Sequence, residues 1–264
     1  MTEISAAMVK ELRDATSAGM MDCKRALQET EGDFDAAVKL LRERGMAQAA
    51  KRAGRETTEG QVVVEADGSV GAIAAVGSET EPVAKNEEFG AFVRKVLETV
   101  KGGGDPSSLE EERAQLSGKL GENIQIVGAK RMEAADGESL SSYVHSPANK
   151  VGALVKTKGG TPEAARSLAL HLTFARPTYG SRDDVPAELV EAEREILQNS
   201  DEVKSKPENV RERIVEGMLN KRFYAESVLT EQQWYRPDEA TGTVAQVLKE
   251  RGIELLDYAW YSVS

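Results

Sequence analysis

The chain has 264 residues, of which 40% are hydrophobic and 30% are charged, and its formal net charge is −11. This profile is typical of a globular chain of about two domains with a sizeable core, and it argues against a disordered chain. The acidic balance argues against broad nucleic-acid binding, which needs cations to neutralise phosphates. The apolar runs are far shorter than the roughly 20 residues that cross a bilayer, so no membrane association is expected.

The charge is spread unevenly. Residues 1–55 carry ten Lys and Arg against nine Asp and Glu, whereas the remainder carries 24 against 36. We interpret the locally basic residues 42–55 as a solvated helix and linker. The N-terminus lacks the apolar core of a signal peptide, and a single cysteine, Cys23, suits a reducing compartment. These features predict a cytoplasmic protein.

The N-terminal residues predict three short amphipathic helices. Met20 and Cys23 fall on one face of the second helix, and Asp33 can cap the third. Gly45 stands where a left-handed C-terminal cap is expected. Three such helices with tight turns predict a compact bundle, and we place its domain at residues 1–55.

A β-rich pattern follows the bundle. Two short β-runs are joined by Asp67-Gly68, a strong hairpin signal. Asn86 can cap the next helix, and the glycine-rich residues 101–108 form a loop before a short polar helix and a strand. Residues 56–139 are therefore expected to form the first core subdomain.

The order of elements repeats in the second half. Two strand-like runs precede Thr161-Pro162, a helix cap followed by proline at the first helical position. The tetrapeptides VGAI and VGAL, which begin at Val70 and Val151, stand before corresponding helices. The alternation near the C-terminus predicts a final strand. Residues 140–264 thus predict a second subdomain, again a small antiparallel sheet with a covering helix.

An insertion at about residues 184–229 interrupts this second subdomain. Helical periodicity continues on both sides of the polar turn NSDEVKSKP, which predicts two long helices in an antiparallel hairpin. Leu189, Ala192, Ile196 and Leu197 are expected to line the inner face of the first arm. Bundle, two-part core and projecting hairpin together predict an α+β fold.

The sequence favours a binding protein over an enzyme. Cys23 lies on an apolar helix face, where a packed core residue is favoured over a nucleophile. His145 and His171 are too far apart in sequence for a local metal pair. The GGGD run at Gly102 lacks the lysine of a phosphate-binding loop. We therefore expect no cofactor, no metal and no catalytic residue.

Residues 16–45 (TSAGMMDCKRALQETEGDFDAAVKLLRERG) resemble the N-terminal module of the bacterial elongation factor Ts family. The resemblance continues in the family's order through KRAGRETTEG, ETEPVAKNEEF, SYVH, HLTFARPTY, SKPENVRERIVEGMLNK and TVAQVLKE, and so covers nearly the whole chain. It implies a ubiquitin-associated-like three-helix bundle, a two-subdomain core and an antiparallel coiled coil. It also implies a guanine-nucleotide exchange factor that binds elongation factor Tu, GDP-bound or nucleotide-free, and promotes release of GDP and Mg²⁺ so that GTP can rebind.

The resemblance also implies which residues contact the partner. The family motif TDFVAKN, whose Asp and Phe act near the partner's magnesium site, matches TEPVAKN here. Glu81 keeps a carboxylate on a longer arm, while Pro82 replaces the aromatic ring and has either its own contact role or only a turn-shaping one. The missing ring leaves an alternative open, in which the chain holds the GTPase like a chaperone with weak exchange activity. A homodimer through the hairpin is the other interaction considered. The expected contacts are Thr80, Glu81, Pro82, Val83, Ala84, Lys85 and Asn86, with Val9, Lys10, Arg13, Met20, Met21 and His145 as further contacts.

Overall fold

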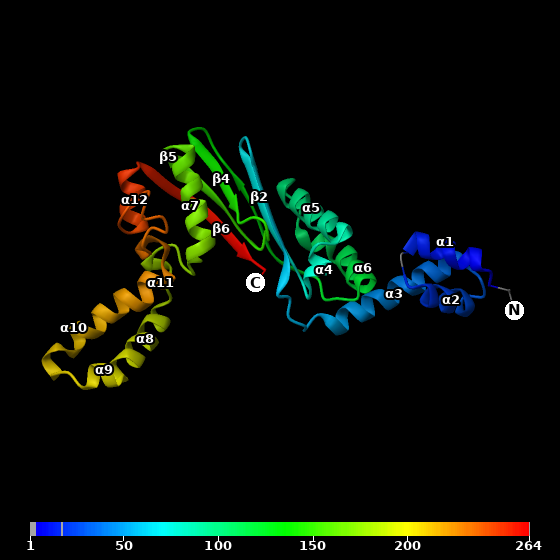
Figure 1. Cartoon of the computed structure of the whole chain (residues 1–264), viewed down its shortest axis with the longest axis horizontal. Coiled ribbons are helices and arrows are strands. Elements are labelled where there is room, and N and C mark those ends of the chain that lie inside the picture. Colours follow the sequence, from blue (N-terminus) through cyan, green and yellow to red (C-terminus); the bar gives the residue numbers. More distant parts are fainter. Residues whose placement is uncertain (1–3, 17, 264) are drawn as a thin grey trace.

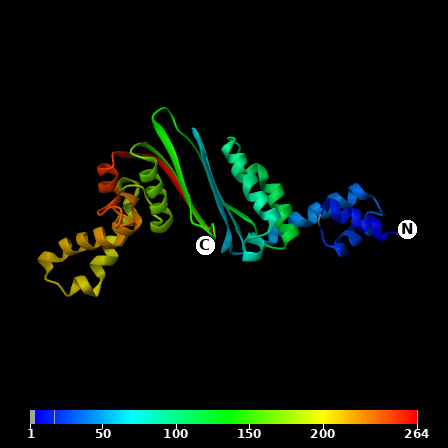
Figure 2. The ribbon, with the colours of Figure 1, turned by 45° about the horizontal axis from the view of Figure 1, so that its top comes forward.

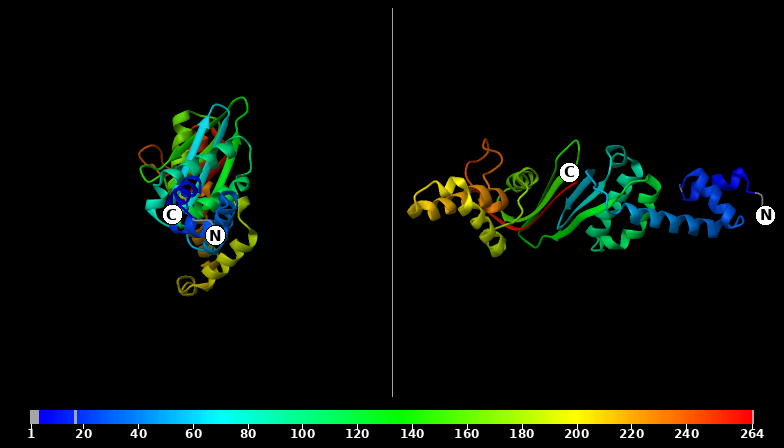
Figure 3. Two further views of the ribbon diagram at one scale, coloured as in Figure 1. Left: turned by 90° about the vertical axis from the view of Figure 1, so that its right-hand side faces the viewer. Right: turned by 90° about the horizontal axis from the view of Figure 1, so that it is seen from below.

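The computed structural model describes residues 4–16 and 18–263. The molecule is elongated, with a helical bundle at one end, a core of sheets and helices in the middle, and a helical hairpin at the other end (Figures 1 and 3). Helices and strands mix as the sequence predicts, so the predicted α+β fold is confirmed.

The N-terminal bundle buries one apolar face of each helix. Leu12, Cys23 and Leu27 are fully buried in its core. Asp33 caps the third helix, because its side chain accepts a hydrogen bond from the Ala36 amide, as the sequence predicts. The helices are α1 (Ala6–Thr16), α2 (Met20–Glu29) and the first part of α3 (Phe34–Arg52).

The third helix is longer than predicted. Gly45, expected to end it, lies inside α3, which continues to Arg52 and packs against α6 (Glu110–Leu120). A Cβ placed on Gly118 would lie 2.9 Å from the Cα of Gly45, so the two helices touch through backbone at this point. The close approach therefore requires glycine at Gly118, whereas Gly45 lies inside α3 at the crossing, and its prediction as a C-cap is wrong.

In the described part of the chain, the strands form two three-stranded antiparallel sheets, ordered β1-β2-β3 and β4-β5-β6. Asp67 pairs with Val70, so the predicted hairpin is present and its two turn residues are Gly68, at φ 59°, and Ser69. The strands are β1 (Glu59–Asp67), β2 (Val70–Ser78), β3 (Gln125–Glu133), β4 (Glu138–Val144), β5 (Val151–Gly159) and β6 (Ile253–Ser262).

Helices cover the outer faces of both sheets (Figure 2). Helix α5 (Glu87–Lys101) packs on the first sheet, and α7 (Pro162–Ala175) packs on the second. The inner faces meet through a shared apolar cluster that includes Ile73 and Leu154. The two halves predicted as subdomains therefore share a core, and their boundaries stay a prediction. The other short core elements are α4 (Glu81–Ala84), α12 (Val244–Glu250) and the turns η1 (Pro106–Leu109), η2 (Arg182–Asp184) and η4 (Leu229–Glu231).

The hairpin projects from the second sheet's side of the core (Figure 1). Leu197 is buried between its arms, but Leu189 and Ile196 are 47% and 64% exposed, so their predicted inner position is wrong. Neighbouring residues differ by about 100° around a helix axis, so with Leu197 directed at the second arm the side chain of Ile196 is directed towards solvent. The second arm is also broken by a π-helical turn. The hairpin elements are α8 (Ala187–Asn199), α9 (Asp201–Lys204), α10 (Glu208–Met218), η3 (Leu219–Tyr224) and α11 (Ala225–Ser227).

Candidate functional site

Residues 80–86 form an exposed turn between the first sheet and its covering helix. Glu81 and Pro82 occupy the first turn of α4, and both are exposed to solvent. Proline is tolerated there, because the amides of a first helical turn have no intrahelical acceptor. Helix α4 lies at the edge of the core, near the C-terminus of the chain (Figure 1).

The outward side of α4 carries an ion pair. The Lys85 ammonium lies 2.7 Å from the Glu81 carboxylate. Its hydrogen bond and charge lower the pKa of Glu81 and raise the pKa of Lys85. The charge of Lys150 lowers the pKa of Glu81 further, while Lys150 itself pairs with Glu59 at 2.6 Å. Glu81 is therefore a carboxylate at neutral pH, and the loop before β5 lies beside it.

The inward side of the same segment is anchored. Ala84 is 6% exposed, and its carbonyl accepts a 2.6 Å hydrogen bond from the Gln61 side chain. Asn86 caps α5 as predicted, because its side-chain oxygen accepts from the amides of Glu88 (2.8 Å) and Phe89 (3.3 Å). The seven predicted residues thus divide into an anchored inner set and an exposed outer set.

The bundle residues predicted as contacts separate in the same way. Lys10 and Arg13 are exposed on α1, whereas Val9 is only 6% exposed and belongs to the bundle core. Val9 therefore supports the bundle and presents little contact surface. Met20 and Met21 are 45% and 65% exposed on α2, so neither side chain belongs to the bundle core. The buried face of α2 is formed by Cys23, Ala26 and Leu27.

His145 stands in an exposed aromatic group. Its Nδ1 lies 3.2 Å from the hydroxyl of Tyr143, and its ring meets the edge of Phe174 at 4.9 Å. Phe174 stacks on Tyr235 at 4.3 Å with an interplanar angle of 5°. Phe174 and Tyr235 were not predicted from the sequence as neighbours of His145. An aromatic side chain exposed on a helix, such as Phe174, can mark a binding surface. The sequence does not show that Phe174 and Tyr235 lie next to His145, because the three residues are far apart along the chain.

The residues considered for catalysis are part of the packing. Cys23 is fully buried, and burial raises the pKa of its thiol, which favours the unreactive protonated form. His171 is fully buried and stacks on the ring of Trp234. The described residues contain no group of three or more His, Cys, Asp or Glu that could hold a metal ion. Nor is any helix of the described chain long and apolar enough to cross a membrane.

The fold and this surface define a class of protein: an elongated α+β protein of several parts, with exposed side chains on the bundle and on the core. The family described as Elongation factor TS matches residues 79–264. Elongation factor Ts of Thioalkalivibrio sulfidiphilus (strain HL-EbGR7) is 40% identical over 275 residues, which cover 98% of this chain and 92% of that protein. Elongation factor Ts of Psychromonas ingrahamii is 38% identical over 267 residues, covering 97% and 89%. That of Escherichia coli O139:H28 is 38% identical over 269 residues, covering 100% and 92%.

The chain belongs to the elongation factor Ts family and is accordingly a translation elongation factor. The predicted family is thereby confirmed. The relatives match over the bundle as well as the core, whereas the family match begins at Glu79, next to the exposed turn.

Proposed function

We propose that this chain binds elongation factor Tu and promotes the release of GDP and Mg²⁺, so that GTP can rebind. The family membership supports the choice of partner. The observation that carries the proposal is the exposed, charged Glu81 at the first turn of α4, held from behind by anchored residues. In this proposal the chain shifts a binding equilibrium and catalyses no chemical reaction.

Glu81 is the residue proposed to act on the magnesium site. Mg²⁺ takes oxygen ligands in a strict octahedral geometry, so a carboxylate brought close to it disturbs that geometry. Lys85 keeps the pKa of Glu81 low, so the carboxylate carries its charge when it meets the partner. Pro82 adds a compact, rigid contact beside it, with φ fixed near −65°.

The other exposed groups are proposed to share the work of binding. Met20 and Met21 offer adaptable apolar contact from the bundle. His145 offers contact from the second sheet's side of the core. Because these groups belong to one chain, binding through one of them raises the effective concentration of the others at the partner's surface. Because coupling is reciprocal, a factor that weakens nucleotide binding is itself weakened by nucleotide to the same degree.

Two measurements test the proposal. Calorimetry should show tighter binding to nucleotide-free elongation factor Tu than to its GDP–Mg²⁺ form, and stopped-flow fluorescence should show faster GDP release when the chain is added. Equal affinities for the two forms contradict exchange. Binding without faster release would instead indicate a protein that only holds the GTPase.

A substitution isolates the carboxylate. Glu81→Gln should slow GDP release by about tenfold, equivalent to about 1.4 kcal/mol of lost transition-state stabilisation. Glu163→Gln is the matched control, because Glu163 is an exposed glutamate in the first turn of α7. Equal release rates for both variants would remove Glu81 from the mechanism.

Self-association through the hairpin is a separate proposal. Leu189, Ala192 and Ile196 are exposed on α8 at spacings of three and four residues, which makes one apolar stripe. Analytical ultracentrifugation of the chain and of Ile196→Glu tests it. A wild-type chain that remains monomeric at high concentration contradicts the proposal.

A further inference from the structure

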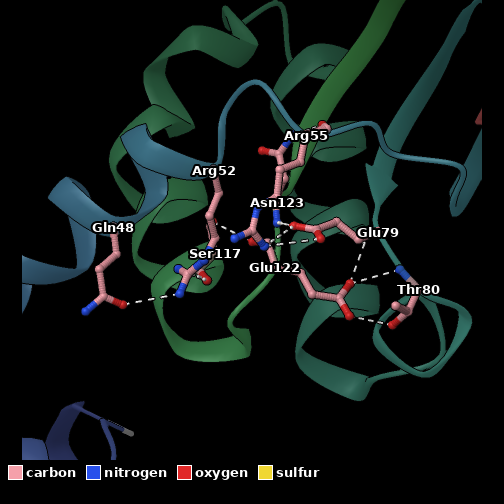
Figure 4. A network of polar contacts seen from close by, with 8 residues as sticks. All are labelled: Gln48, Arg52, Arg55, Glu79, Thr80, Ser117, Glu122 and Asn123. Carbon is pink, nitrogen blue, oxygen red and sulfur yellow. Dashed lines mark hydrogen bonds and ion pairs between the residues drawn. The ribbon is translucent and has the colours of Figure 1, made fainter.

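A polar network lies behind the exposed turn and joins three parts of the chain (Figure 4). It connects the end of α3 and the segment that follows it, the residues between β2 and α4, and the loop between α6 and β3. Its members are Gln48, Arg52, Arg55, Glu79, Thr80, Ser117, Glu122 and Asn123.

Glu122 makes the central contacts of this network. Its Oε2 accepts hydrogen bonds from the backbone amides of Glu79 (3.1 Å) and Thr80 (3.0 Å). Its Oε1 accepts a hydrogen bond from the hydroxyl of Thr80. The ladder between β1 and β2 ends at Ser78, so these amides follow directly after the sheet. Hydrogen bonds to a carboxylate are stronger than neutral ones, so Glu122 fixes the backbone just before α4.

Glu79 also binds the loop that carries Glu122. Its carboxylate accepts a 2.6 Å hydrogen bond from the amide of Asn123 and lies 3.3 Å from the guanidinium of Arg55. Asn123 is 2% exposed and donates its side-chain amide to the carbonyl of Arg55 at 2.7 Å. The segment that leaves the bundle is therefore tied to the same loop that holds the exposed turn.

The position of Glu122 is itself fixed by α6. Gly121 ends that helix in the left-handed conformation, at φ 79°, which glycine adopts without steric cost. The buried hydroxyl of Ser117 donates a 2.6 Å hydrogen bond to the Glu122 carbonyl. Arg52, at the end of α3, donates to the carbonyl of Ser117 at 3.5 Å. The bundle helix, α6 and the exposed turn thus form one connected unit.

We infer that Glu122 is a positioning residue for partner binding. It holds Glu79 and Thr80 so that Glu81 and Pro82 are presented in one orientation, and it links that orientation to the bundle. The inference rests on the proposed function, because it assigns a task to the exposed turn. A turn that is ordered before binding loses less conformational freedom on binding, and its carboxylate reaches the partner in a reproducible geometry.

The experiment compares Glu122→Gln with Glu112→Gln in the full chain. Glutamine keeps the size of the side chain but removes its negative charge and turns one oxygen into an NH₂ group, so the remaining oxygen is a weaker, neutral acceptor for the amides of Glu79 and Thr80. Glu112 is the matched control, because it lies on α6, the helix that precedes Glu122, and pairs with Lys95 on α5, away from the turn. Thermal unfolding should give the same midpoint for both variants.

Amide hydrogen exchange, measured by NMR on the free chain, is the first readout. The amides of Glu79 and Thr80 should exchange about tenfold or more faster in Glu122→Gln than in the control, because their charged acceptor becomes a weaker, neutral one. The amide of Ile73 in β2 serves as an internal reference and should not change. Unchanged exchange at Glu79 and Thr80, or faster exchange throughout β2, overturns the inference.

GDP release from elongation factor Tu is the second readout. The maximal rate should fall about tenfold in Glu122→Gln, while the concentration that gives half of it changes little, because the loss is one of orientation rather than of contact. Normal release by Glu122→Gln overturns the inference and leaves the proposed function standing. If the wild-type chain fails to accelerate GDP release, the proposed function is wrong and Glu122 has no role in partner binding. Amide exchange would still show whether Glu122 orders the backbone of Glu79 and Thr80.

Discussion

His171 is a buried histidine whose protonation state supports the local structure. Its Nδ1 accepts a 3.1 Å hydrogen bond from the Tyr235 amide, so Nε2 carries the proton and donates to Gln232 at 3.1 Å. Burial lowers the pKa of the imidazole below its ordinary value. The neutral form is therefore the one that the folded chain holds, stacked at 5.5 Å on Trp234.

This predicts a pH dependence of stability. Since the folded state lowers the pKa of His171, the unfolded state binds more protons, and the free energy of unfolding must rise with pH. The contribution is complete above the ordinary histidine pKa and is lost as pH falls towards the lowered one. Urea unfolding at pH 7.5 and about pH 5.5 measures it. The difference should shrink in His171→Gln but persist in the control His145→Gln, whose histidine is exposed. A difference of the same size in all three chains contradicts the assignment.

Pro82 is the clearest departure from the family motif, and it can be tested directly. Pro82 lies in the first turn of α4, so phenylalanine fits there without requiring a new backbone acceptor. Replacing Glu81-Pro82 by Asp-Phe should speed GDP release by about tenfold, because a buried ring contributes on the order of 1–2 kcal/mol. Stopped-flow release with the GTPase of the same organism checks this. A rate within about twofold of wild type would make Pro82 a turn residue only.

The crossing of α3 and α6 determines where the bundle meets the core. Gly118 touches the backbone of Gly45, and the Arg42–Glu111 ion pair joins the same two helices. A side chain at Gly118 would have to push α3 away, whereas a Cβ on Gly45 would meet no atom of the described residues within 4 Å. The crossing therefore requires glycine at Gly118 but has room for a small side chain at Gly45.

This asymmetry gives a matched pair of substitutions. Alanine is favoured over glycine inside a helix by about 1 kcal/mol at either position. Gly45→Ala should keep that gain, whereas Gly118→Ala should lose it to overpacking, which typically costs about 1–3 kcal/mol. Urea unfolding followed by circular dichroism measures the difference. Equal stability of the two variants would show that the crossing yields easily and that close packing there is not required.

The elongated arrangement separates the bundle from the rest of the molecule, apart from α3 (Figure 3). The apolar clusters of the two sheets and their covering helices are built from Val62 onwards, so the sheets have apolar packing of their own. Removing residues 1–55 should leave a folded core with a lower unfolding temperature, because α6 loses α3. Binding to elongation factor Tu should weaken by at least about tenfold, because one linked contact is lost. Circular dichroism and calorimetry test this, and unchanged affinity would make the bundle dispensable for binding.

Much of the fold was predictable, because its signals are local. Asn86, Asp33 and Thr161 cap their helices as expected, since a cap needs only the next two or three amides. The errors involve contacts with distant residues. Gly45 was predicted as a helix end because the residue that packs on it, Gly118, lies far along the chain. Ile196 was placed inside the hairpin because periodicity does not reveal where a second helix lies.

The sequence by itself was sufficient for the family, the order of elements and the position of the TEPVAKN turn, because motifs and periodicity are properties of neighbouring residues. Tertiary structure alone brought Glu122 to Thr80, Phe174 and Tyr235 to His145, and the inner faces of the two sheets together. These residues are distant in sequence and meet only when the elements pack. Packing depends on the fit of side-chain shapes and on hydrogen bonds between elements, and neither can be seen in a local stretch of sequence.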